Sequence, residues 1–517
     1  MKLLTQNQAR ELDRLAMEEY NIKGIQLMGS AGLAIANLAA QKTGDVHDPI
    51  IVILCGKGNN GGDGFAAALE LDKKGIKVFV FCISTFEEIK GDAKYFLELC
   101  INGNVQIEFS GDLLDESYRC DLIIDALLGT GVRGTVKESI IPWIGWINKN
   151  NCVVLSVDIP TGLQADSGIA EPVGVKANYT LTMGYAKLGL AMQQGPFLAG
   201  EILIADIGFP NNAINKVSGL SWNKALDESI SCFLEPLNIN THKYKQGNVL
   251  VIAGSKGMTG AAALCSYGSL RVGAGLVIAA APSSLNNIYE KKITEGMTIT
   301  CEDENVGYFS SKNCEEIIQR FDWADVIAIG PGLGPNEETI KFVKILISAA
   351  NKPLVIDADG LRPFMDNYKL FEEITVPFVI TPHYGEFCRL TDSDSKTIEV
   401  EFTSIVTDFM IDFNGILVAK NAPSCVFYKN KGIVNSTGNP ALATAGTGDV
   451  LTGMIAGLIA QGLEPINAAQ TAVYFHGKAA DLFCEKNGMR GMIASDLLNT
   501  IPTVLAKYDE LTTSGVC

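Results

Sequence analysis

The sequence alternates short apolar runs, typical of buried β-strands, with segments of helical periodicity, and this alternation constrains the fold more than any other feature. Residues 1–42 predict two helices, the first opened by a capping box between Thr5 and Gln8. The apolar runs that follow are 50–54, 77–83, 121–125, 153–158 and 201–210. Strands that alternate with helices form βαβ units and pair in parallel. The first part of the chain is therefore predicted to be an α/β domain.

A second series begins after a polar, irregular stretch at 211–240. Its strand-like runs are NVLVIAGS, GLVIAAAP, DVIAIGPGLG, PLVIDADGL, FVITPHYGEF and GILVAKN. A hairpin, CVFYKNKGIVN, and a glycine-rich loop leading into a long helix follow. The length of 517 residues fits two to four domains. We expect two α/β domains, 1–212 and 236–517, with a linker at 213–235.

Composition excludes several classes of partner. The formal net charge of −17 opposes binding to nucleic acid and to anionic membranes, so small molecules are the expected partners. The apolar stretches are too short to span a bilayer, and the N-terminus lacks the apolar core of a signal peptide. The 13 cysteines include no C-x-x-C spacing, which favours free thiols in a reducing cytoplasm. We expect a cytoplasmic protein that forms a homo-oligomer.

The segment CGKGNNGGDGF at 55–65 combines a strand, a glycine turn and a helix, an order typical of phosphate-binding loops. Its glycines spell G-x-G-x-x-G, but a dinucleotide fingerprint also needs an acidic residue at the tip of the next strand. The next strand offers none before Glu87. Asp63 would also repel a pyrophosphate. The loop is therefore not predicted to be an ordinary dinucleotide site.

Other strand tips add polar side chains. Asp125 and Asp158 each end an apolar run, and Thr161 follows closely. Because carboxyl ends of parallel strands line one crevice, these residues can converge with Asn60 and Asp63. Carboxylate, amide and hydroxyl oxygens suit a hard cation. The alternative is that each aspartate only caps a helix.

GKGNNGGDG, DALLGTG and SVDIPTGLQADSG resemble the N-terminal domain of the NAD(P)H-hydrate epimerases over about residues 1–212. The resemblance implies a Rossmann-like three-layer fold that interconverts the R and S hydrates of NADH and NADPH. It implies potassium bound by Asn60, Asp125 and Thr161, and a catalytic Asp158 facing the damaged ring. By motif, the hydrate would contact Asn59, Asn60, Gly61, Gly62, Asp63, Gly129, Thr130, Gly131, Val132, Arg133, Gly134, Thr135 and Asp158.

A second candidate site lies in GNPALATAGTGD at 438–449, directly before an apolar helix. Gly446 and Gly448 allow backbone amides to converge at the helix N-terminus, which forms an anion hole. Asp449 lies at the mouth of that helix, where it can take a proton from a hydroxyl beside a phosphate. The alternative is a capped helix after a turn. TPHYGEF offers His383 and Glu386; a lone histidine is usually structural, but the position of His383 after Pro382 at a strand tip favours a site. Asp357 and Asp359 also end a strand, where a structural role is as plausible as a functional one.

VLVIAGSKGMTGAA, GPGLG, DADGL, TPHYGEF and GNPALATAGTGDVL resemble the ribokinase-like NAD(P)H-hydrate dehydratases over about 236–510. The resemblance implies dehydration of the S hydrate, driven by ADP with Mg2+. By motif, the hydrate would contact Ala261, Ala262, Gly332, His383 and the catalytic Asp449. The nucleotide would contact Lys420, Asn421, Ala422, Pro423, Ser424, Asn439, Thr444, Ala445, Gly446, Thr447 and Gly448.

Together the two resemblances predict a bifunctional repair enzyme, an isomerase fused to a lyase. Two alternatives stay open. The C-terminal fold also hosts small-molecule kinases, with the first domain as a fused nucleotide-binding module. The N-terminal half could also be an inactive binding module for scaffold or RNA-associated proteins.

Overall fold

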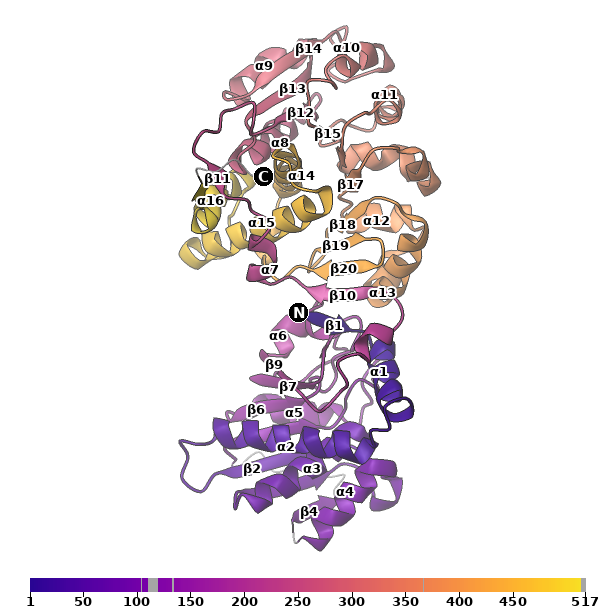
Figure 1. The fold of residues 1–517 in the computed structure, drawn as a ribbon, viewed down its shortest axis with the longest axis vertical. Coiled ribbons are helices and arrows are strands. Elements are labelled where there is room, and N and C mark those ends of the chain that lie inside the picture. Colours follow the sequence, from indigo (N-terminus) through magenta and orange to yellow (C-terminus); the bar gives the residue numbers. More distant parts are fainter. Residues whose placement is uncertain (104, 110–119, 133, 366, 513–517) are drawn as a thin grey trace. The chain divides into compact units, whose positions relative to one another are not determined.

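The computed structural model describes residues 1–103, 105–109, 120–132, 134–365 and 367–512 (Figure 1). By its internal contacts the chain divides into two compact units, Lys2–Trp222 and Asn223–Cys517, the second together with Met1. Both are built from strands and helices in alternation, so the α/β class expected from the sequence is confirmed.

The Lys2–Trp222 unit is built on a parallel sheet in the order β4-β3-β2-β5-β6-β7-β9. Its strands are β2 (Ile50–Cys55), β3 (Lys77–Cys82), β4 (Gln106–Phe109), β5 (Leu122–Ala126), β6 (Val153–Val157), β7 (Tyr179–Met183) and β9 (Glu201–Ala205). Its helices are α1 (Gln6–Glu18), α2 (Gly24–Lys42), α3 (Asn59–Lys73), α4 (Gly91–Asn102), α5 (Ile141–Lys149) and α6 (Gly195–Leu198).

This sheet has helices on both faces. In β2, Ile51 and Ile53 join the core formed with α2, α3 and α4, whereas Val52 and Leu54 join the core formed with α5. A strand buried on both sides reads as a continuous apolar run, which explains the sequence of β2. The expected three-layer arrangement is therefore present in this unit.

Two short strands outside this seven-stranded sheet bring the start of the chain to the sheet's carboxyl edge. β1 (Lys2–Leu4) pairs in parallel with β8 (Ala186–Lys187), with Leu4 opposite Lys187. The capping box of Thr5 and Gln8 then starts α1. Helix α1 is thereby held next to Lys187, a placement that matters for the candidate site.

The second unit contains a larger sheet in the order β14-β13-β12-β15-β16-β17-β18-β19-β20, parallel as far as β18 and antiparallel beyond it. Its strands are β12 (Asn248–Ile252), β13 (Leu276–Pro282), β14 (Met297–Cys301), β15 (Val326–Ile329), β16 (Leu354–Ile356), β17 (Phe378–Ile380), β18 (Ile416–Ala419), β19 (Cys425–Tyr428) and β20 (Lys431–Val434). The predicted hairpin is β19–β20 and is confirmed.

The helices of this unit are α7 (Asp227–Ser231), α8 (Thr259–Arg271), α9 (Asn286–Lys292), α10 (Cys314–Ile318), α11 (Glu337–Ser348), α12 (Tyr384–Leu390), α13 (Ser395–Asp412), α14 (Thr447–Ala460), α15 (Pro465–Asn487) and α16 (Ala494–Leu505). α8 and α14 pack so closely that only glycine fits at position 453: a Cβ there would lie 2.0 Å from the carbonyl oxygen of Cys265. The contact fixes α14, whose first turn carries Asp449.

The stretch expected to be an irregular linker at 213–235 is more ordered than its polar sequence indicated. It contains β10 (Ser221–Lys224) and helix α7, and it buries Trp222 and Ile230 almost completely. Isolated apolar residues in a polar segment carry no periodicity, so their burial could not be predicted. Within the described residues, no helix is both long enough and apolar enough to cross a membrane.

Candidate active sites

The glycines of the β2–α3 loop serve backbone packing in the Lys2–Trp222 unit. A Cβ on Gly56 would lie 1.9 Å from the carbonyl oxygen of Leu127, and one on Gly61 would lie 1.9 Å from that of Gly56. No side chain fits at either position. The loop after β2 and the loop after β5 therefore cross at the carboxyl edge of the sheet, and α3 begins there at Asn59.

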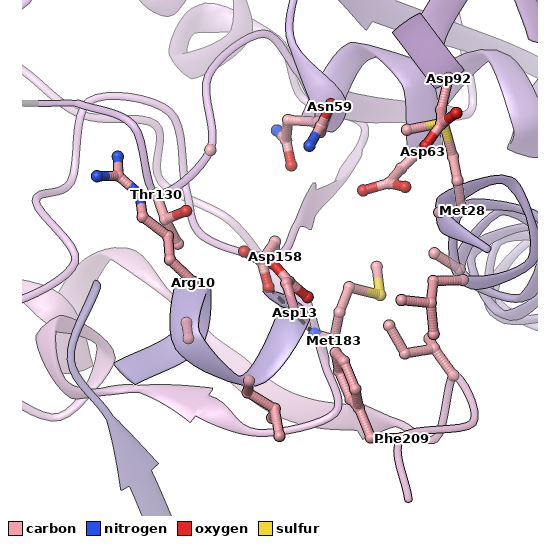
Figure 2. A pocket seen from close by; sticks show the side chains of 18 of the residues that line it. Arg10, Asp13, Met28, Asn59, Asp63, Asp92, Thr130, Asp158, Met183 and Phe209 are labelled. Carbon is pink, nitrogen blue, oxygen red and sulfur yellow. Dashed lines mark hydrogen bonds between the residues drawn. The ribbon is translucent and has the colours of Figure 1, made fainter. Parts of the chain in front are cut away.

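A cavity of about 200 Å³ opens at this edge (Figure 2). Six of the residues predicted to bind substrate line it: Asn59, Asn60, Asp63, Gly129, Thr130 and Asp158. Further lining residues were not predicted, among them Arg10 and Asp13 from α1, Met28 from α2, Met183 and Lys187. The cavity is therefore a polar pocket with an apolar wall, assembled from several strand ends and the first helix.

Asp158 and Lys187 form a buried ion pair in this cavity. Asp158 follows β6 with a backbone φ of +64°, and its carboxylate accepts hydrogen bonds from the Lys187 ammonium, the Thr182 hydroxyl (3.2 Å) and the Met183 amide (3.1 Å). Lys187 also donates to the carbonyl oxygens of Met183 (3.2 Å) and Tyr185 (3.1 Å). Both charged groups are thus held in fixed orientations at the cavity wall.

Two further carboxyl groups face the pair. Figure 2 shows Asp13 beside Asp158, with Asp63 across the open space. Asp13 is exposed at the mouth of the cavity, where packing on one side partly desolvates its carboxyl group and raises its pKa to about 6; Lys187 opposes this rise and the nearby Asp158 adds to it. Burial, with Asp158 and Asp13 nearby, raises the pKa of Asp63 well above its usual value. The cavity can therefore hold protonated carboxyl groups near neutral pH, which is the condition for a general acid.

Asp125 and Thr161 form a separate polar cluster, fully buried and outside the residues that line the cavity. The Asp125 carboxylate accepts from the Thr161 hydroxyl (2.6 Å), the Thr161 amide (2.9 Å) and the Ser156 hydroxyl (2.8 Å). The Thr161 hydroxyl in turn accepts from the amide of Leu128 (3.0 Å). Asp125 and Thr161, two of the three residues expected to hold potassium, thus lie in contact with each other, but neither of them lines the cavity.

Asn60 lies between the cavity and the β5 loop. A Cβ on Gly129 would lie 3.2 Å from the Asn60 side chain, so the two loops meet here. The Asn60 side chain is nearly buried, and its Nδ2 finds no hydrogen-bond partner among the described residues. Leaving a buried polar atom without a hydrogen-bond partner costs about 1–3 kcal/mol of stability. We therefore expect a bound group to contact the Asn60 side chain at this position.

The other residues of this unit that were predicted to bind substrate do not line the cavity. Gly62 packs against Met28 and Ala93, and Gly61 against the backbone of Gly56. The lining residues also do not include the following members of the predicted set: Gly131, Val132, Gly134 and Thr135. Arg133 lies outside the described residues.

In the second unit, Asp449 lies in the first turn of α14, directly after a sharp turn. Gly446 has φ +89°, a left-handed conformation that suits glycine, and acts as the N-cap of the helix. Burial raises the pKa of Asp449 to about 7, with Asp357 and Asp359 adding to the rise and Lys420 opposing it. A carboxyl group that titrates near neutrality at a helix N-terminus is suited to act as a general base.

Lys420 links this turn to the neighbouring strands. It follows β18, its ammonium pairs with the buried Asp357 after β16 (2.7 Å), and a Cβ on Gly448 would lie 3.3 Å from its Nζ. The Thr452 hydroxyl of α14 donates to the second oxygen of Asp357 (2.6 Å). The sequence left a structural and a functional role for Asp357 equally plausible. In the structure, Asp357 is the anion that positions Lys420 beside the glycine turn.

The other predicted hydrate-binding residues lie at two places. Ala261 and Gly332 touch, since a Cβ on Gly332 would lie 2.9 Å from that of Ala261, whereas Ala262 is fully buried. His383 is the exposed N-cap of α12, where its Nδ1 accepts from the amide of Gly385 (3.0 Å). The backbones of His383 and Lys420 pair in an isolated parallel β-bridge.

The predicted nucleotide segment after Lys420 consists of Asn421, Ala422, Pro423 and Ser424, which are exposed or half-buried. Asn439 does not extend freely: its Nδ2 donates to Asp481 (2.8 Å), and its Oδ1 accepts from the amide of Ala441 (3.0 Å). Thr444, Ala445 and Thr447 form the glycine turn with Gly446 and Gly448, and the Thr447 carbonyl contacts the buried His476 (2.9 Å). Burial lowers the pKa of His476 to about 4, so this ring is neutral at pH 7.

These features define the class of protein: an α/β enzyme of two units, each with acidic side chains and glycine-rich turns at the carboxyl ends of a parallel sheet. Two family models match the chain, a YjeF-related protein N-terminus over residues 24–189 and an NAD(P)H-hydrate dehydratase over residues 249–503. A bifunctional NAD(P)H-hydrate repair enzyme from Moorella thermoacetica is 37% identical over 99% of this chain and 98% of its own. The chain belongs to the family of bifunctional NAD(P)H-hydrate repair enzymes.

Other relatives agree with this assignment. The bifunctional NAD(P)H-hydrate repair enzyme of Escherichia coli is 31% identical over 96% of this chain and 92% of its own. A crystal structure of an ADP/ATP-dependent NAD(P)H-hydrate dehydratase from Bacillus subtilis, co-crystallised with ATP and Mg2+, matches with 25% identity and a TM-score of 0.48. It covers 55% of this chain and 98% of its own. The two full-length relatives, at 37% and 31% identity, confirm the family resemblance inferred from the sequence.

Proposed function

We propose that the first unit interconverts the R and S hydrates of NADH and NADPH and that the second dehydrates the S form at the expense of ADP. The supporting observation is the match to bifunctional NAD(P)H-hydrate repair enzymes over 99% of the chain. We assign epimerisation to residues 1–212 and dehydration to residues 236–517. The activities complement each other because dehydration consumes one epimer and epimerisation replenishes it.

Epimerisation requires the hydroxyl of the hydrate to leave its ring carbon and to return on the opposite face. The departing oxygen needs a proton, and the returning water must lose one. Asp63 is placed to supply that proton, since burial raises its pKa well above the usual value, and the exposed Asp13, with a pKa raised to about 6, is placed beside the Asp158–Lys187 pair. The Asp158–Lys187 pair positions the damaged ring, and its carboxylate accepts the proton that the returning water loses.

The donor set around Asn60, Asp125 and Thr161 fits the potassium ion expected from the family. Rotation of the Asn60 amide by half a turn would place its oxygen, which can bind a cation, where the unpaired Nδ2 now lies. Burial raises the pKa of Asp125, so a nearby cation would stabilise its ionised form. When bound, the ion would fix the loops after β2 and β5 relative to each other through Asn60 and Asp125.

Asp125→Asn is expected to abolish the stabilisation that potassium gives the protein and to slow epimerisation, because the amide is neutral but keeps the shape of the carboxylate. Melting temperature is measured in potassium and in a bulky organic cation. Ser156→Ala is the matched control, since it removes one hydrogen bond to Asp125 and keeps the charge. An equal potassium effect in Asp125→Asn and in the unmodified protein would show that the ion binds elsewhere.

Dehydration begins with a poor leaving group, because hydroxide departs slowly from carbon. We propose that Asp449 takes the proton of the ring hydroxyl while that oxygen attacks the terminal phosphorus of ADP, which releases AMP. The phosphate ester then loses phosphate, and a ring proton departs to restore NAD(P)H. The amides of the Gly446–Gly448 turn stabilise the transferred phosphoryl group, as helix N-termini do for anions.

Magnesium fits this site as a companion of the nucleotide. Among the described residues, no group of three or more His, Cys, Asp and Glu is placed to hold a metal ion. Mg2+ is commonly held by one or two carboxylates together with substrate phosphates. Asp357, Asp359 or Asp449 would supply a carboxylate, and the ion would neutralise charge on the phosphates.

We expect faster dehydration with ADP than with ATP. Lys420 is the cation placed beside the glycine turn, and its charge is already balanced by Asp357. Less positive charge then remains to compensate a third phosphate. Rates are compared with each nucleotide enzymatically freed of the other. An equal or higher rate with ATP would contradict the assignment of the donor and leave the dehydratase assignment intact.

A kinase is the second candidate function, because the ribokinase-like fold of the second unit also hosts small-molecule kinases. The two candidates differ in their products. A kinase releases a phosphorylated substrate, whereas the proposed enzyme releases free phosphate and reduced nicotinamide. S-NADH hydrate, protein and ADP are incubated, and phosphate and absorbance at the reduced-nicotinamide band are measured together. Stable phosphorylated hydrate without a rise in absorbance would favour the kinase.

A further inference from the structure

Two cysteines meet at the amino edge of the first unit's sheet. Cys120 precedes β5 and Cys152 precedes β6, two strands that pair in parallel with Leu122 opposite Val153. The Sγ atoms of Cys120 and Cys152 lie 3.3 Å apart. Neither residue lines the cavity, and the strands carry Asp125 and Asp158 at or beyond their opposite ends. This thiol pair is therefore separate from the candidate active site.

The pair is more accessible than most described cysteines. Cys120 and Cys152 are both half-buried, whereas Cys55, Cys82, Cys100, Cys265, Cys301, Cys314, Cys388 and Cys425 are buried. Burial raises the pKa of the Cys100 and Cys301 thiols to about 12, so these remain protonated and unreactive. In contrast, the hydrogen bond from Cys120 lowers the pKa of the Cys152 thiol.

We propose that Cys120 and Cys152 form a redox-active dithiol, which low-molecular-weight disulfides convert to an intramolecular disulfide. The step is balanced by thiol–disulfide exchange. The Cys152 thiolate attacks one sulfur of the small disulfide, and the other sulfur leaves as a thiolate. Cys120 then attacks Cys152 Sγ, which expels the second small thiol and leaves the protein disulfide. The small disulfide is reduced to two thiols as the protein dithiol is oxidised.

The structure around the two cysteines favours the attack of Cys120 on Cys152 Sγ over a lasting mixed disulfide. The residue after Cys120, Asp121, accepts from the amide of Ile50 (2.8 Å) and donates its own amide to the Ile50 carbonyl (2.9 Å). Both cysteines also pack against the core beneath α5. On the other side, Val153 directly after Cys152 is paired with Leu122 in the β5–β6 ladder. Because both backbones are held, the resolving thiol stays within reach of the attacked sulfur, and exchange is intramolecular.

The test uses an aromatic disulfide reagent whose released thiolate is coloured. The full chain carries Cys232→Ser, Cys484→Ser and Cys517→Ser to remove two described accessible thiols and the C-terminal one, which lies outside the described residues. We expect two coloured thiolates per chain and an intact mass lower by two hydrogens. Adding Cys120→Ser should give one released thiolate, with the other half of the reagent still attached to Cys152.

Peptide mapping of the unmodified chain after treatment with oxidised glutathione gives an independent measurement that needs no variant to fold. We expect a peptide pair joined through Cys120 and Cys152. Reagent retained on Cys152 in the chain that keeps Cys120, or no reaction at either thiol, would overturn the proposal. This inference does not depend on the proposed function.

Discussion

Asp449→Asn should lower the rate of dehydration about 10³-fold and leave the interconversion of R and S hydrates unchanged, since a general base contributes about 10²–10⁴-fold. Asparagine keeps the size of the side chain but cannot take a proton from the ring hydroxyl. Dehydration is followed at the reduced-nicotinamide band, and epimerisation is followed chromatographically without nucleotide. Asp394→Asn is the matched control, an exposed acid in the same unit that caps α13 and whose replacement can still cap it.

The pH dependence of dehydration gives a second readout of the same residue. Because the pKa of Asp449 is raised to about 7, the residue is protonated and inactive as a base below that pH. The value of kcat/KM should therefore fall as pH decreases through about 7 and level off above it, because this ratio reports groups of the free enzyme. A profile that stays flat from pH 5 to about 9 would contradict a role for Asp449 as the base.

Asp158→Asn should lower epimerisation about 10²–10⁴-fold while dehydration of purified S hydrate continues at its normal rate. Asparagine tolerates the φ of +64° at this position, so the backbone can be retained. The substitution leaves the buried Lys187 ammonium without its carboxylate, which removes the charged pair from the cavity. Melting temperature is measured alongside activity to separate loss of function from loss of fold.

Asp206→Asn provides the control for that experiment. Asp206 is exposed in the same unit and accepts from the amide of Gly208 (2.9 Å), a contact that asparagine can preserve. It should retain full epimerisation. If Asp158→Asn also stops dehydration of the S hydrate in a folded protein, the assignment of the two activities to separate units is wrong.

The sequence predicted the fold class well because the strands are buried on both faces. Run 50–54 is apolar throughout and run 153–157 is apolar except for Ser156, and such a run is the strongest pattern a parallel strand can show. Weaker strands were missed: β4 has mostly exposed side chains, and β8 contains only Ala186 and Lys187. A strand that short carries no periodicity, yet its pairing with β1 brings α1 to the cavity.

The candidate sites were predicted only where a residue lies within a glycine-rich motif. Asp158 and Asp449 were identified this way. Lys187 and Asp13 were missed, because both reach the cavity through the β1–β8 pairing, which links positions far apart in sequence. The signal available for Lys187 was a single lysine within the otherwise apolar YAKLGL, and no partner for it could be deduced from the sequence alone.

The most direct test of the central claim starts from purified R-NADH hydrate with the full chain, ADP and Mg2+. If one chain carries both activities, the R form is converted to the S form and then dehydrated, so all of the substrate returns to NADH. The Asp158→Asn variant should regenerate NADH from S hydrate but hardly from R hydrate. An unmodified chain that dehydrates S hydrate completely and leaves R hydrate unchanged would contradict the account.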